Sequence, residues 1–298
     1  CLLVMAVYGC SGEPGVGGTN NNVFGGGNSK QTQGAMPTYN TGLTGIKMDF
    51  LPNSPPVEMY DGQVFPFSLE IFNTGNTTTN PYITLSGFDK NIIHADWTNR
   101  QPGEVSKKGP DYPEGGYGSI NEEVSVTLPP EVSSLPTTLK ATACYDYITD
   151  AGVQVCVDPD PTNNRDDVCT PKTVSISAGQ AAPLAISSVV QQPSRGITSF
   201  IVTIKNVGGG DVLKVDKVSR CMDQLSPIET DVVDVISAAL GTQALSCTPA
   251  TVRLVNGQGV TNCKIAGLTG NAYTTTLMLS FKYGYKSSIT KSVNIRRM

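Results

Sequence analysis

The sequence QVFPFSLEIFNTG at residues 63–75 decides the fold. Apolar and polar residues alternate along it, which is typical of a half-buried β-strand, and Asn73-Thr74-Gly75 ends it as a turn. The same pattern returns at residues 199–208, SFIVTIKNVG, where a strand again runs into Asn-x-Gly. We interpret the two stretches as corresponding parts of a duplicated β-sandwich.

Further strands with the same alternation are predicted on both sides of these two stretches. They lie at residues 46–51, 82–86, 122–128, 173–177, 184–190, 251–255, 260–265, 274–283 and 289–295. Residues 139–148 and 153–157 are predicted to form a hairpin about Thr149–Gly152, and residues 231–240 permit either a strand or a short helix. Short strands without long amphipathic helices favour an all-β fold of two immunoglobulin-like antiparallel β-sandwiches in tandem, at residues 44–178 and 183–298.

The segment before the first sandwich has the composition of an export signal and a tether. Residues 2–8, LLVMAVY, are apolar, and residues 11–43 are rich in Gly and Asn without apolar periodicity, which predicts a disordered tether. Residues 1–10 are expected to be a signal-peptide remnant, because Val7-Tyr8-Gly9-Cys10 resembles the lipobox of prokaryotic lipoproteins. That resemblance implies a lipid on Cys10, although Tyr8 stands where a small residue is usual. The alternatives are that residues 2–8 form an ordinary strand, or a donor strand that inserts into the next copy of the chain in a fibre.

The paired strand–Asn-x-Gly pattern resembles the CARDB and related immunoglobulin-like modules of prokaryotic surface proteins. Asn73 and Gly75 match that pattern in the first half, and Asn206 and Gly208 match it in the second. The layout from Gly45 onward is also similar to that of predicted surface lipoproteins of small-genome archaea, in phrases such as ACYDYITDAGVQVCVDPDP. These resemblances imply fold and location, and no activity.

Composition excludes several classes of function. Charged residues make up 15% of the chain, well below the usual share of about 25%, and the net charge of −4 comes without a basic patch, so no nucleic-acid partner is expected. The chain has one histidine and no Cys-x-x-Cys pair, which excludes zinc sites of the usual spacing.

Six of the eight cysteines lie beyond the tether and indicate disulfides in an oxidising compartment. Cys156 and Cys169 flank a short acidic loop, and Cys247 and Cys263 flank a hairpin at Asn256-Gly257, so these couples are paired first. The remaining pair, Cys144 and Cys221, could bridge the two sandwiches or bond a neighbouring chain.

The acidic loop after Cys156 offers many oxygen ligands in a short stretch. Calcium takes six to eight oxygen ligands, so calcium is a possible cofactor here and no other cofactor is expected. A solvated surface loop is the alternative, because the spacing matches no known motif. The residues concerned are Asp158, Asp160, Asn163, Asp166 and Asp167.

Three other groups of residues have features typical of a site or of the core. Asn76-Thr77-Thr78 fits the N-glycosylation pattern. His94 and Trp97 are interpreted as packing or loop residues. Tyr112 and Tyr117 are predicted in one long loop, where exposed tyrosines either anchor recognition or cover the sandwich.

The sequence therefore predicts a protein without catalytic activity, anchored by lipid on the outer cell surface, with a structural or adhesive role. Its expected partners are the membrane and other surface proteins, glycans or copies of itself. The alternative function is a self-assembling subunit of a filament or surface layer.

Overall fold

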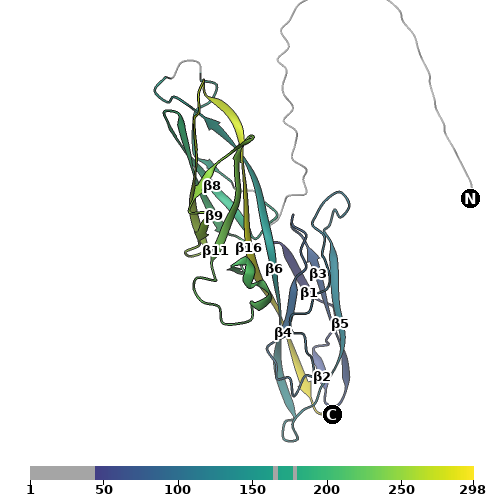
Figure 1. Cartoon of the computed structure of the whole chain (residues 1–298). Helices are drawn as coiled ribbons and strands as arrows, with labels where there is room; N and C mark the ends of the chain where they lie inside the picture. Colours follow the sequence, from purple (N-terminus) through teal and green to yellow (C-terminus); the bar gives the residue numbers. More distant parts are fainter. Residues whose placement is uncertain (1–43, 164–166, 177–179) are drawn as a thin grey trace, which may run out of the picture. The chain divides into compact units, whose positions relative to one another are not determined.

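The computed structural model describes residues 44–163, 167–176 and 180–298, and nearly all of its regular structure is β-strand. The expected all-β fold is thus confirmed (Figure 1). The expected signal-peptide remnant and tether lie outside the described residues. The elements are β1 (Ile46–Phe50), β2 (Glu58–Tyr60), β3 (Val64–Asn73), β4 (Tyr82–Ser86), β5 (Tyr117–Ser125), β6 (Ser134–Val157), β7 (Val174–Ser175), β8 (Leu184–Ser194), β9 (Ile197–Asn206), β10 (Asp211–Leu213), the 3₁₀-helix η1 (Val215–Arg220), β11 (Val232–Leu240), β12 (Gln243–Ala244), β13 (Ser246–Thr248), β14 (Thr251–Arg253), β15 (Gln258–Ala266) and β16 (Tyr273–Arg296).

The strands form one large sheet and two smaller ones. The large sheet has the order β12-β11-β16-β6-β4. In addition, β10 and β2 pair with β16, and β14 pairs with β11. The smaller sheets have the orders β1-β3-β5 and β13-β15-β9-β8-β7. β1 lies against β16 and β8 against β6, and one continuous apolar core fills the space between the large sheet and both smaller sheets.

β6 and β16 form the backbone of the large sheet. They pair antiparallel over all 24 residues of each strand, from Tyr273 opposite Val157 to Arg296 opposite Ser134, and Figure 1 shows the two strands side by side along the fold. Burial alternates along both strands, so that the odd-numbered residues face the core, as the two-residue period of a strand requires.

The expected hairpin about Thr149–Gly152 is wrong, because these residues lie inside the continuous strand β6. Thr149 is fully buried, and its hydroxyl donates to the Leu184 carbonyl at 3.0 Å and lies 2.8 Å from the Tyr283 hydroxyl. Pairing with β16 thus replaces the local turn, since all four residues lie opposite β16 residues, from Phe281 to Met278. The ambiguous segment at residues 231–240 forms strand β11.

The two smaller sheets repeat one another in detail. In each, the strand that ends in Asn-x-Gly (β3 or β9) lies between two partners. One partner is β1 or β8, and the other is β5 or β15, whose second residue is glycine. The matching cross-strand pairs are Ile46–Asn73 with Leu184–Asn206, Ile71–Gly118 with Ile204–Gly259, and Phe72–Tyr117 with Lys205–Gln258. The duplication predicted from the two Asn-x-Gly stretches is present in the strand register.

The boundary expected at residues 178–183 does not separate the two halves. β6 pairs with β4 near its start, whereas its far end pairs with the start of β16. β16 in turn pairs with β11 early, and ends beside β2 of the first half. Each long strand thus begins in its own half and finishes in the other, and all described residues belong to one compact unit.

Four buried tyrosines mark the place where the long strands cross from one half to the other. Tyr145 and Tyr147 on β6 face Tyr285 and Tyr283 on β16, with ring centroids 5.8 to 6.3 Å apart. Their hydroxyls accept backbone N–H groups in matching places: Tyr145 from Ile46 at 3.3 Å, Tyr283 from Leu184 at 3.2 Å, Tyr147 from Asn76 at 2.8 Å and Tyr285 from Gly210 at 2.7 Å. The quartet ties both Asn-x-Gly turns to the large sheet.

We expect this tyrosine quartet to make the fold sensitive to alkali. Burial raises the pKa of all four hydroxyls above the ordinary value of about 10, so the protonated form is the one that the fold favours. The resulting stability is complete below pH 10 and is lost as the pH rises towards the folded-state pKa. Tyrosinate absorbance and circular dichroism should show exposed tyrosines ionising near pH 10 and the quartet ionising only as the β-signal disappears. Ionisation of all tyrosines in one step with the β-signal intact would contradict this.

Candidate functional site

Three disulfides join the six cysteines in the couples considered from the sequence. Cys156 bonds Cys169, Cys247 bonds Cys263, and Cys144 bonds Cys221 within the same chain. Three disulfides in one fold indicate an oxidising, extracellular-like environment.

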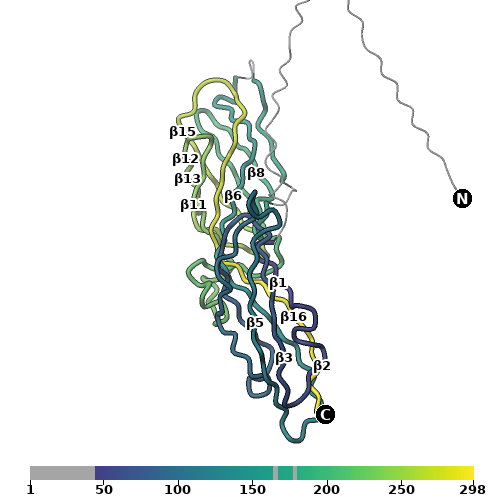
Figure 2. Tube along the Cα trace, turned by 90° about the vertical axis from the view of Figure 1, so that its right-hand side faces the viewer, coloured from purple at the N-terminus to yellow at the C-terminus, as the bar shows by residue number. Residues whose placement is uncertain are grey.

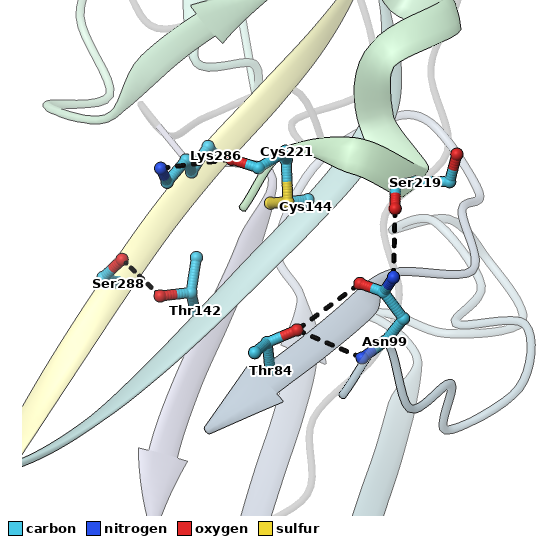
Figure 3. Close-up of a disulfide and its surroundings, with 8 residues drawn as sticks. All are labelled: Thr84, Asn99, Thr142, Cys144, Ser219, Cys221, Lys286 and Ser288. Atoms are coloured by element: carbon cyan, nitrogen blue, oxygen red, sulfur yellow. Dashed lines mark hydrogen bonds between the residues drawn. A yellow bond between two sulfur atoms is a disulfide. The ribbon is translucent and has the colours of Figure 1, made fainter. Parts of the chain in front are cut away.

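The Cys144–Cys221 disulfide fastens η1 to the outer face of the large sheet (Figure 3). On the same side, the Asn99 amide donates to the Ser219 carbonyl at 3.0 Å, and the Lys286 amino group donates to the Cys221 carbonyl at 3.3 Å. Val218 of η1 packs over Gly284, where any larger side chain would press on it. The disulfide therefore sits in a small separate core that covers the middle of β6 and β16.

A polar hollow of about 330 Å³ adjoins this disulfide. Glu229 precedes the lining residue Thr230; it accepts from the Ser226 N–H and hydroxyl and pairs with Lys217 at 3.1 Å. The Ser226 hydrogen bonds, together with Lys217, lower the pKa of Glu229 to about 2. The lining residues include Asp211, Asp223, Asp231 and Lys286. Because Lys286 donates to the Cys221 carbonyl, we interpret this hollow as part of the contacts that attach η1 to the large sheet.

The acidic loop uses its described carboxylates to build turns. Asp158 is buried and accepts the Asp160 N–H at 3.0 Å, while Asp160 accepts from the Thr162 hydroxyl at 2.6 Å, a bond that lowers the pKa of Asp160. Asp166 lies outside the described residues, whereas Asn163 and Asp167 are described. Within residues 44–163, 167–176 and 180–298, no three His, Cys, Asp or Glu side chains gather as a metal site would require.

Trp97, His94 and Asn76 make local contacts. Trp97 is buried and its indole N–H donates to Glu122, whereas His94 is exposed and lies 3.2 Å from the Thr127 hydroxyl. Asn76 is partly buried in the first Asn-x-Gly turn, and its side-chain oxygen lies 3.3 Å from the Tyr147 hydroxyl. Glycosylation at Asn76 stays a prediction.

Tyr117 differs from its expected place. It begins strand β5 rather than lying in the loop with Tyr112, because Gly116 and Gly118 fit closely against neighbouring chain and let β5 pair with β3 from its first residue. Its ring stands on the outer face of the sheet β1-β3-β5, and 54% of the residue is exposed. Figure 2 shows these strands side by side.

Tyr117 belongs to a group of outward side chains that we name the aromatic face. The Tyr117 ring packs against Phe72 with centroids 5.3 Å apart, and its hydroxyl donates to Glu70 at 3.4 Å. Beside them, the Lys47 amino group donates to Asp49 at 2.6 Å. The face consists of Lys47, Asp49, Glu70, Phe72, Tyr117 and Ser119, which occupy two adjacent rows across the three strands. No local pattern in the sequence indicates this face, since the two rings meet only through strand register.

Comparison with models of known protein families finds no match, and a search of curated proteins finds no significant match either. No helix among the described residues is long and apolar enough to cross a membrane.

Proposed function

We propose that this protein is a structural or adhesive component of the cell exterior, without catalysis of its own, that is held at the membrane by a lipid on Cys10. The observation that carries the proposal is the disulfide-bonded, interlocked β-fold. Three disulfides suit an oxidising exterior, and two strands of 24 residues that each serve both halves suit a module that must keep its shape. Asp158 and Glu229 accept hydrogen bonds within turns and Glu122 pairs with Arg100, so each of these three carboxylates has a structural role.

The anchor is tested by detergent phase partitioning and intact mass of the chain expressed with its complete export signal. We expect the protein in the detergent phase, with the mass of a chain that starts at Cys10 and carries lipid, because a lipid chain gains about 0.8 kcal/mol per buried methylene. Cys10→Ser should move it to the aqueous phase, whereas the matched control Cys1→Ser should leave it lipidated. A wild-type mass that retains residues 1–9 without lipid would overturn the anchor.

The alternative function, a self-assembling filament subunit, is favoured by one feature of β1. In the second half, β8 is flanked by β9 on one side and β7 on the other, and the Gln180 side chain bonds both backbone groups of Ile186. The matching strand β1 has β3 on one side and no second partner among the described residues. An unpaired strand edge can accept a strand from another chain, and residues 2–8 of a second copy are the candidate. Unlipidated protein that forms fibres in electron micrographs would select this alternative.

A further inference from the structure

We infer that the aromatic face of the β1-β3-β5 sheet binds the sugar rings of an uncharged glycan. This inference rests on the proposed adhesive function and names its partner. Its starting point is an aromatic pair, Phe72 and Tyr117, on the outer face of a sheet where polar residues are the norm. Tyr117 is more than half exposed, at 54%.

In the second half, the corresponding strands pair without aromatic residues at the matching positions. The positions that match Phe72 and Tyr117 in strand register are Lys205 and Gln258, which form the corresponding cross-strand pair between β9 and β15. Both halves keep the core and the Asn-x-Gly turn, so the three corresponding strands of the second half pair without aromatic residues at these positions. We therefore attribute the aromatic pair of the first half to binding rather than to strand pairing.

The chemistry around the rings matches a sugar. An aromatic ring presents a flat apolar surface to the C–H face of a pyranose, and nearby carboxylates, hydroxyls and amines bond its hydroxyl groups. Glu70 and Asp49 supply acceptors, Lys47 supplies donors, and Ser119 supplies both. The face carries two carboxylates, Asp49 and Glu70, and one amine, Lys47, which is already paired with Asp49. This charge balance favours an uncharged glycan over an acidic one.

The size of the face argues against a protein partner. A stable protein interface buries about 800 Å² on each side around an apolar centre, whereas one aromatic side chain contributes roughly 150–250 Å². Two rings, one of them only partly exposed, supply less than half of that area. They are sufficient for one or two sugar rings.

The test is affinity measured by isothermal titration with four defined probes: cellohexaose, maltohexaose, mannohexaose and chitohexaose. We expect the full chain to bind at least one of them. Tyr117→Gln and Phe72→Lys, which install the residues of the second half, should weaken that binding by about tenfold or more. Tyr117→Phe should retain most of it because the ring remains. Tyr273→Gln, at a partly exposed tyrosine of β16, is the matched control and should bind as the wild type does.

A second measurement on the wild type keeps the inference testable if a variant does not fold. The bound hexasaccharide should protect the Tyr117 ring from nitration by tetranitromethane and leave Tyr112, which is 51% exposed, reactive. The inference is overturned if none of the probes binds, if Tyr117→Gln binds unchanged, or if Tyr117 is not protected. Self-association that depends on Tyr117 would also overturn it, in favour of a second copy. None of these results alters the lipid test at Cys10, so the two proposals fail separately.

Discussion

Replacing Gly75 with alanine should destabilise the fold by about 3 kcal/mol or more. A Cβ at this position would overlap the Tyr147 hydroxyl and lie 2.8 Å from the Ala181 carbonyl oxygen. The hydroxyl has no room to retreat, because Tyr147 is fully buried and its oxygen accepts the Asn76 N–H while donating to Ala181 at 2.7 Å. Relieving the overlap would break both hydrogen bonds and leave buried polar groups unpaired.

Chemical denaturation of Gly75→Ala beside Gly109→Ala checks this expectation. Gly109 lies in a loop where an added Cβ meets no atom within 4 Å, so its substitution controls for the general effect of alanine and should change the free energy of unfolding little. Gly208→Ala should repeat the loss in the second half, since its Cβ would lie 2.6 Å from the Tyr285 hydroxyl. Equal stability of Gly75→Ala and Gly109→Ala would refute the proposed role of the tyrosine quartet.

Removing the Cys144–Cys221 disulfide should lower the free energy of unfolding by about 2–5 kcal/mol. The bond closes a loop of 77 residues, and a longer loop leaves the unfolded chain more freedom when the bond is lost. The double variant Cys144→Ser/Cys221→Ser keeps the residue volume similar and avoids free thiols. The loss is measured by urea denaturation, with hydrogen exchange showing whether η1 opens first.

The Cys156–Cys169 disulfide is the matched comparison, because it closes only 13 residues. Loop entropy alone makes its removal about 1.5 kcal/mol less damaging than removal of Cys144–Cys221. The reverse order of stabilities would show that native packing around the acidic loop, and not the unfolded chain, decides the contribution of these bonds.

The strands of the sandwich and the two short-range disulfides were predictable from local patterns. Alternation in residues 63–75 reflects one buried face, and Cys247 and Cys263 flank a turn that brings them together. The Cys144–Cys221 bond followed only as the remaining pair. The aromatic face could not be predicted from the sequence, because Phe72 and Tyr117 meet through the register between β3 and β5.

Local sequence patterns are sufficient to predict a duplicated all-β fold, since a two-residue period and the turn chemistry of Asn-x-Gly are local properties of a strand and its end. By contrast, tertiary packing determines that residues 149–152 continue a strand, and that β6 and β16 each finish in the opposite half. Alternation of apolar and polar residues shows which side of a strand is buried, but it does not show which other strand pairs with it. Partner and register are chosen by the whole core, here by four tyrosines that accept backbone N–H groups from both halves.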